Sequence, residues 1–206
     1  MDKGIPCKQT PLEPLNHLII YFIYFNKGSG IIVNNKVRLA GIAYESLVNG
    51  PGMRRVFFAQ GCRHNCKGCF NPSTHCFKGG ELRDISVLIH DIKNNPLIQG
   101  VTFSGGDPFE QAEAFGHMAY KIKELNLNIW CYTGYTLEYI LNNVDNKYWQ
   151  ELLRNIDVLV DGKFEEDKKD QGLRFRGSKN QRIIDVKKSL QYGNITIKNF
   201  KLKSYR

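Results

Sequence analysis

The sequence has no hydrophobic run long enough to cross a membrane. Its most apolar stretch, residues 15–25, falls short of the roughly 20 residues that a spanning helix needs. The few charges before this stretch have mixed sign and no clear small-residue cleavage site follows it, so the pattern does not favour a secretory signal peptide. Long internal repeats and low-complexity segments are missing as well. These absences predict a protein of the cytoplasm.

The sequence also lacks the cysteine spacing of a secreted disulfide framework. Six cysteines are present: Cys7, Cys76 and Cys131 are scattered, and Cys62, Cys66 and Cys69 are clustered. Three thiols at C-x3-C-x2-C spacing are too close to be bonded to one another, and one would be left over in any pairing. Dispersed thiols beside a tight cluster therefore predict a metal-binding loop in a reducing compartment.

Acidic residues are few in the last part of the chain. The net charge of the 206 residues is +9, and residues 163–206 hold 13 Lys or Arg against 5 Asp or Glu. Such an excess is typical of proteins that meet nucleic acid, an acidic protein or an anionic cofactor. A solvated lysine-rich surface explains it equally well, so the charge alone does not choose a partner.

The pattern of elements predicts an α/β fold. Residues 1–36 are expected to be an N-terminal extension outside the fold, and residues 37–206 a domain with a basic C-terminal segment. Strands are predicted at 37–42, 53–59, 101–104, 128–132 and 156–160, and helices at 85–92, at 112–122 and in one run up to 154. Such alternation indicates βαβ units and a mainly parallel sheet, whose strand ends carry the chemistry. The cysteine loop and residues 105–108, 133–135 and 161–162 all follow predicted strands.

Three close thiolates suit an iron–sulfur cluster better than zinc. Structural zinc takes four ligands, commonly from C-x2-C pairs, and this chain has no second pair. His64 or His75 could complete a zinc site, although His64 lies inside the loop, where reaching the same ion would be strained. A cubane cluster is normally held by four cysteines, so three would leave one iron open to a substrate or cofactor. Both centres stay open at this point.

The loop, with Phe70 after its last cysteine, resembles the signature of the radical S-adenosylmethionine (SAM) superfamily. Six further segments resemble, more narrowly, the family of anaerobic ribonucleoside-triphosphate reductase activating proteins. They are Asn-Gly-Pro-Gly-Met-Arg (49–54), Cys-Phe-Asn-Pro (69–72), Ser-Gly-Gly-Asp-Pro (104–108), Tyr-Thr-Gly-Tyr (132–135), Val-Leu-Val-Asp-Gly-Lys-Phe (158–164) and Arg-Gly-Ser-Lys-Asn-Gln-Arg (176–182). The likeness runs in order from about residue 37 to residue 186.

The resemblance implies a partial, open (β/α) radical-SAM barrel and an oxidoreductase activity. It also implies that Cys62, Cys66 and Cys69 ligate a [4Fe-4S] cluster whose open iron chelates the amino and carboxylate groups of SAM. Reduction then cleaves SAM to methionine and a 5′-deoxyadenosyl radical, which removes a hydrogen atom from a glycine of the large reductase subunit. No catalytic residue is implied beyond the cluster and SAM, because the cofactors carry the chemistry.

The resemblance also places SAM contacts on three strand ends. The expected contacts are Gly68, Cys69 and Phe70 at the adenine, Gly105, Gly106 and Asp107 at the methionine part, and Thr133 at the ribose or carboxylate. Other readings are a plain β–α turn at 105–108 and a core position for Phe70. Asp161 is a weaker candidate, for the substrate glycine loop or for the cap of the next helix. Residues 176–182 are read as a loop that closes the site or meets the reductase, or as a solvated loop.

Arg54 and Arg55 are read as residues that steer an anionic partner or that lie with exposed heads at a strand end. The expected partners are the large reductase subunit and a low-potential electron donor such as flavodoxin or ferredoxin, with no membrane and no nucleic acid. Two alternatives within radical chemistry are activation of another glycyl-radical enzyme and a small-molecule radical SAM reaction. A zinc-stabilised, basic nucleic-acid-binding module is the alternative from another class.

Overall fold

The computed structural model describes residues 35–200 of the chain. The predicted N-terminal extension, residues 1–36, therefore lies outside the described residues except for its last two. The first described strand begins at Lys36, one residue before the predicted boundary. Among the described residues, none of the helices combines the length and the apolar character that crossing a bilayer requires.

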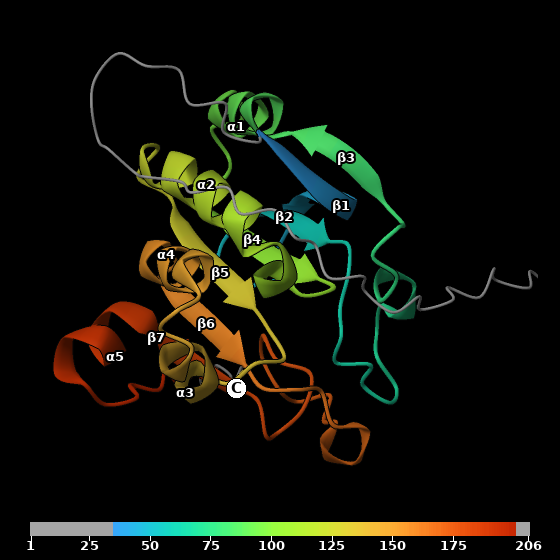
Figure 1. Ribbon diagram of the computed structural model, residues 1–206, viewed down its shortest axis with the longest axis vertical. Coiled ribbons are helices and arrows are strands. Elements are labelled where there is room, and N and C mark those ends of the chain that lie inside the picture. The colour runs from blue at the N-terminus through green and yellow to red at the C-terminus, as the bar shows by residue number, and fades with distance from the viewer. Residues whose placement is uncertain (1–34, 201–206) are drawn as a thin grey trace, which may run out of the picture. The chain divides into compact units, whose positions relative to one another are not determined.

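Within residues 35–200, seven strands form an open sheet in the order β3-β1-β2-β4-β5-β6-β7 (Figure 1). The strands are β1 (Lys36–Ser46), β2 (Arg54–Ala59), β3 (Glu81–Asp84), β4 (Gly100–Gly105), β5 (Asn128–Tyr132), β6 (Val158–Asp161) and β7 (Arg182–Asp185). The helices are α1 (Ile85–Lys93), α2 (Ala112–Lys123), α3 (Leu137–Asn142), α4 (Lys147–Asn155) and α5 (Val186–Tyr192). Three 3-10 turns lie at Pro72–Thr74, Pro108–Gln111 and Glu166–Lys168.

The four central strands are parallel and the outer ones are antiparallel. β2, β4, β5 and β6 pair in parallel, whereas β1 joins β2, β3 joins β1, and β7 joins β6 with opposite directions. This arrangement confirms the predicted α/β class with a mainly parallel centre. The sheet does not close, because β3 and β7 each lie at an edge.

Two features of the element pattern differ from the prediction. The single helical run expected up to residue 154 is two helices, because Thr136 caps α3 and Asn146, after a break, caps α4 through the Trp149 amide. The strands β3 and β7 and the helix α5 were not predicted. β7 begins at Arg182, the last residue of the predicted 176–182 loop, and Asp185 then caps α5 by accepting from the Lys188 amide.

The alternation of side chains along the strands separates the core from the site. Phe57, Phe103, Cys131 and Leu159 point from neighbouring strands into the main hydrophobic core, together with the buried faces of α1, α2 and α4. Figure 1 shows α2 and α4 lying across this side of the sheet. Phe58 and Ser104, which pair across β2 and β4, and Tyr132 of β5 point to the other face, where they line a cavity.

Arg54 and Arg55 are buried, so the expectation that their heads are exposed at the strand end is wrong. The Arg54 guanidinium donates to Thr102 Oγ1 at 2.7 Å and to Asn128 Oδ1 at 2.8 Å. Burial lowers its pKa to about 10. Arg55 donates to the carbonyl of Tyr44 at 2.8 Å. Both arginines therefore link strands of the sheet, and Arg54 also binds the Pro51 carbonyl in the loop before β2, so neither is available to a partner.

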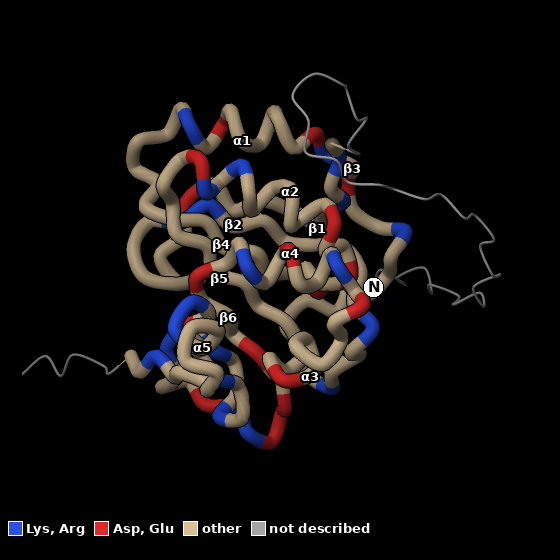
Figure 2. Tube along the Cα trace, turned by 60° about the vertical axis from the view of Figure 1, so that its left-hand side comes forward, with Lys and Arg blue, Asp and Glu red and all other residues tan. Residues whose placement is uncertain are grey.

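Much of the positive charge in the C-terminal part of the domain is paired. Figure 2 shows basic and acidic residues interspersed around β6 and α5. Lys187 contacts Asp157 at 2.9 Å, and Lys198 contacts Asp185 at the same distance. The excess charge counted from the sequence is therefore not one continuous free patch on the described residues.

Candidate functional site

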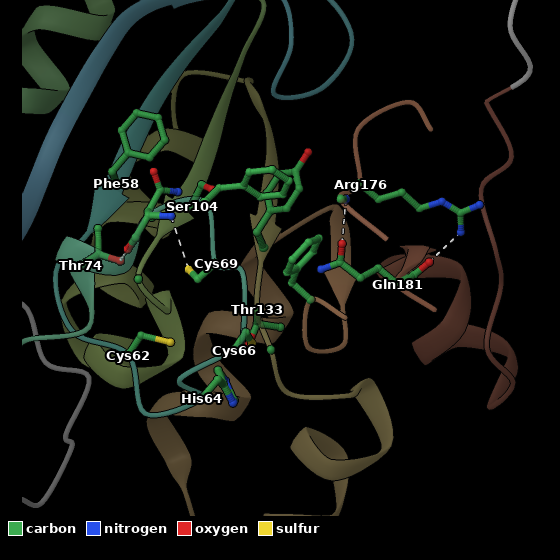
Figure 3. Close-up of a pocket in the computed structure, with 18 of the residues that line it drawn as sticks. Phe58, Cys62, His64, Cys66, Cys69, Thr74, Ser104, Thr133, Arg176 and Gln181 are labelled. Atoms are coloured by element: carbon green, nitrogen blue, oxygen red, sulfur yellow. Dashed lines mark hydrogen bonds between the residues drawn. The ribbon is translucent and has the colours of Figure 1, made fainter. Parts of the chain in front are cut away.

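A cavity of about 600 Å³ opens on the face of the sheet that carries Phe58, Ser104 and Tyr132. The three clustered cysteines, Cys62, Cys66 and Cys69, all line it (Figure 3). Of the other predicted site residues, Phe70, Gly105, Gly106 and Thr133 line the same cavity, whereas Gly68 and Asp107 do not. The structure thus brings together residues from the cysteine loop and from the ends of β4 and β5.

The cysteine loop is held closed by the segment that follows it. The Gly61 amide donates to the Thr74 carbonyl at 2.8 Å, and the Cys62 amide donates to the His75 carbonyl at 3.3 Å. The Asn71 amide donates to the sulfur of Cys69 at 3.4 Å. Such a contact stabilises negative charge on sulfur and tunes a metal centre bound there. Backbone hydrogen bonds between the loop and the segment after it therefore set the shape of the loop.

Burial disfavours the thiolate form of two of the clustered cysteines. Burial raises the pKa of Cys62 to about 11, and burial likewise raises the pKa of Cys66. A bound metal centre deprotonates its thiol ligands. Within residues 35–200, no three His, Cys, Asp or Glu side chains lie close enough to hold one metal ion. What the cavity offers is three sulfur ligands and room for a larger group, and thiolates are the ligands that iron–sulfur clusters take.

The amides of Gly106 and Asp107 connect the end of β4 to the start of the cysteine loop. The Gly106 amide donates to Ala59 at 2.8 Å, and the next amide, of Asp107, donates to Gly61 at 2.9 Å. A Cβ atom on Gly106 would lie 2.4 Å from the carbonyl oxygen of Gly61. The close approach of two backbones therefore requires glycine here, independently of any ligand in the cavity.

Asp107 joins three loops from a fully buried position. Its Oδ2 accepts from His64 Nε2 at 2.7 Å and from the Gly134 amide at 2.9 Å. The hydroxyl of Thr133 lies 2.8 Å from the same oxygen, and Oδ1 accepts from the Phe109 amide at 3.0 Å. Because a carboxylate only accepts, His64 Nε2 is the donor. The carboxylate is thus occupied by protein groups and does not line the cavity, where it was expected beside the SAM ammonium.

A second group of contacts lies beside this one. Glu110 accepts from Arg63 Nε at 2.8 Å and from the Tyr135 hydroxyl at 2.7 Å. The His64 ring packs edge-on against the Tyr135 ring with centroids 4.4 Å apart. Sequence reasoning missed the roles of His64 and Glu110, because each partner lies on a distant part of the chain and leaves no local signal.

The loop between β6 and β7 forms the opposite wall of the cavity. Arg176, Gly177 and Gln181 line it, and Figure 3 shows Arg176 and Gln181 across from the cysteines. The Gly177 amide donates to Gln181 Oε1 at 2.8 Å, and Arg176 donates to the Gln181 carbonyl at 2.6 Å. The predicted 176–182 segment therefore borders the site, while its contact with a partner stays a prediction.

Two further predicted positions are settled by their contacts. Phe70 is 60% exposed and packs on Phe164 with ring centroids 4.9 Å apart, so it lies at the cavity rim and is not a core aromatic. Asp161 is buried, accepts from the first amide of α3, at Leu137, and pairs with Arg182. Asp161 does not cap the helix that follows it, because Glu165 and Asp185 begin the next two helices; it binds the first amide of the earlier helix α3, whose N-cap is Thr136.

Comparisons with known proteins agree with a cluster-binding domain. The family model described as "4Fe-4S single cluster domain" matches residues 48–184. The chain is similar to the anaerobic ribonucleoside-triphosphate reductase-activating protein of Vibrio cholerae, with 42% identity over 147 residues, 66% of this chain and 90% of the relative. The proteins of that name from phage T4 and Escherichia coli are each 36% identical over 66% of this chain, covering 86% and 90% of their own lengths. The chain belongs to the family of anaerobic ribonucleoside-triphosphate reductase-activating proteins.

Proposed function

We propose that this protein activates an anaerobic ribonucleoside-triphosphate reductase by generating a glycyl radical on the large subunit of that enzyme. The observation that carries the proposal is the set of three cysteines at C-x3-C-x2-C spacing lining one cavity with the glycine-rich end of β4. The names of the relatives supply the partner. The open sheet is read as a partial radical-SAM barrel, in a protein of the cytoplasm.

Cys62, Cys66 and Cys69 would hold a [4Fe-4S] cluster as thiolates, leaving one iron for the amino and carboxylate groups of SAM. When bound and reduced, the cluster supplies the electron that cleaves SAM to methionine and a 5′-deoxyadenosyl radical, the species that removes the glycine hydrogen. The chain itself supplies the ligands, the walls of the cavity and the fixed position of the loop. The hydrogen bond from the Asn71 amide would keep electron density on the Cys69 sulfur.

The remaining predicted residues divide into contact and positioning roles. We assign SAM contacts to Cys69 and Phe70 on the cysteine loop, to Gly105 and Gly106 at the end of β4, and to Thr133 at the end of β5. Gly68, which does not line the cavity, forms the turn before Cys69 with a positive φ. Asp107 has a positioning role and does not contact SAM: its buried carboxylate fixes His64, Thr133 and Gly134. Preorganisation of this kind places reacting groups without any side chain taking part in the chemistry.

The rim of the cavity suits a macromolecular substrate. Val48 and Phe70 line the cavity and remain largely exposed, and the neighbouring Leu47 is exposed as well. Exposed apolar residues at the mouth of a site are typical of surfaces that another protein covers. A glycine-bearing segment of the reductase would enter between these residues and the loop that carries Arg176 and Gln181.

An anaerobic reconstitution with iron and sulfide tests the proposal. The reconstituted protein should bind about four irons per chain. After reduction it should release 5′-deoxyadenosine from SAM, and mixing with the reductase should give a glycyl-radical EPR signal. Zinc at about one per chain without SAM cleavage would favour the nucleic-acid-binding alternative. SAM cleavage with a radical on another glycyl-radical enzyme, or on no protein, would favour the other two alternatives.

A further inference from the structure

A second cavity, of about 690 Å³, lies on the helix side of the cysteine loop. Its lining includes five aromatic residues, among them Tyr135, Tyr139 and Trp149, and three cations. The residues come from β1, from the cysteine loop and from α3 and α4, so the cavity is built by segments far apart in the sequence. Nothing in the proposed radical chemistry uses it.

Two side chains in contact separate the two cavities at one point. Successive residues of the cysteine loop face opposite ways, because His64 lines the first cavity and Arg63 lines the second. The same division occurs after β5, where Gly134 lines the first cavity and Tyr135 the second. The rings of His64 and Tyr135 meet at 4.4 Å at this point. The second cavity therefore reaches the back of the loop that holds the cysteines.

Aromatic rings continue from this contact to the surface. Tyr135 stacks on Tyr139 with centroids 5.5 Å apart and planes 7° from parallel, and it contacts Trp149 at 4.6 Å. Tyr139 is 51% exposed. An exposed aromatic backed by further rings offers large contact area at a small entropic cost, which is common in protein interfaces.

The rim of the second cavity is basic. Three cations line it, Lys36, Arg38 and Arg63, against the carboxylates Glu110 and Glu113. Glu110 and Arg63 form an ion pair and compensate each other, which leaves Lys36 and Arg38 against Glu113 in the lining. A fourth cation, Lys147, is exposed beside the lining residue Tyr148, 4.8 Å from its ring. An acidic surface is the complement of this rim.

We propose that this second cavity is the docking surface for an acidic protein that carries one electron at low potential. The inference rests on the proposed function, which fills the first cavity with SAM and a segment of the reductase. The electron must then reach the cysteine loop from another side, and the second cavity adjoins the back of that loop. The carrier would lose one electron and the cluster would gain it, passing from the 2+ to the 1+ state, with no bond or proton transferred.

Reversal of two rim charges tests the docking surface without touching the site. Lys36→Glu and Lys147→Glu, combined, change one exposed residue on β1 and one on α4. The matched control combines Lys93→Glu and Lys188→Glu, two exposed lysines that line neither cavity. The probe is a flavodoxin. Calorimetry measures its dissociation constant with each reconstituted protein, and absorbance follows the oxidation of its semiquinone or hydroquinone by the cluster. Dithionite, which is small and needs no docking surface, serves as the second reductant.

The rim variant is expected to bind flavodoxin about tenfold more weakly at low ionic strength, with a difference that shrinks in high salt. Reduction by flavodoxin should slow by a similar factor, while dithionite-driven SAM cleavage stays at the level of the control. Equal flavodoxin affinity and rate in both variants would overturn the inference. The inference would also be overturned if the rim substitutions changed only the self-association of the protein, or only the binding of residues 1–34 to the rest of the chain. Failure of dithionite-driven cleavage in the unaltered protein would instead refute the proposed function.

Discussion

Asp107→Asn tests whether the buried carboxylate is the anchor of the site. The substitution keeps the shape of the side chain but replaces one carboxylate oxygen with an NH2 group. With the amide nitrogen at the Oδ2 position, the donors of His64 and Gly134 would both face another donor. A hydrogen bond to a charged group contributes about 1.5–3 kcal/mol, so losing two of them should cost about 3 kcal/mol after the imidazole has relaxed to its other tautomer.

The measurement is urea unfolding of the metal-free chain, read as a shift of the transition midpoint at unchanged slope. Asp167→Asn, at an exposed position, is the control and should change the stability by less than about 0.5 kcal/mol. Iron retention after reconstitution should fall in the Asp107 variant together with stability. If the metal-free variant is as stable as the control and loses only SAM affinity, the positioning role is refuted and a direct contact with the SAM ammonium is favoured.

Three further predictions concern other parts of the molecule. Gly134→Ala should lower both iron retention and stability, because the added Cβ would lie 2.3 Å from the His64 ring. Unchanged iron content would contradict the assigned packing. Cys66→Ser should bind less than the full set of four irons and cleave no SAM, as measured by iron and sulfide analysis, and full occupancy would refute the ligand assignment. Glu138→Gln should lower the melting temperature by about 1–3 °C at pH 7, since the ion pair with Arg182 is half exposed. Because that pair lowers the pKa of Glu138 to about 2, its contribution is complete above the ordinary pKa of glutamate and disappears as pH falls toward 2, so the two melting temperatures should converge in acid.

The parts of the fold that sequence could predict are those with local signals. The cysteine spacing and the glycine pair after β4 are contiguous in sequence, and β5 was predicted with its observed bounds. β7 escaped prediction because it has only four residues, two of them charged, and because its pairing partner in the sheet lies 20 or more residues earlier. The break between α3 and α4 depends on capping by Asn146. The apolar periodicity of the sequence continues across this break, so it predicts one helix.

The site also has features that the local sequence predicts and features that depend on long-range contacts. That three cysteines share a cavity follows from their spacing, but the function of Asp107 depends on a contact with His64, 43 residues away. Arg54 illustrates the opposite error. An arginine that opens a strand is ordinarily exposed, and only the meeting of Thr102 and Asn128 around its guanidinium makes burial favourable. Long-range hydrogen bonds of this kind have no signature in a single sequence.

The two tryptophans of the chain lie on opposite faces of the sheet. Trp130 packs beside Val160 and Phe175 on the face that carries the cysteine cavity, whereas Trp149 lines the second cavity. Intrinsic fluorescence therefore comes from one emitter on each face. Trp130→Phe and Trp149→Phe would give single-emitter proteins, so that an event on either face could be followed spectroscopically without an added label.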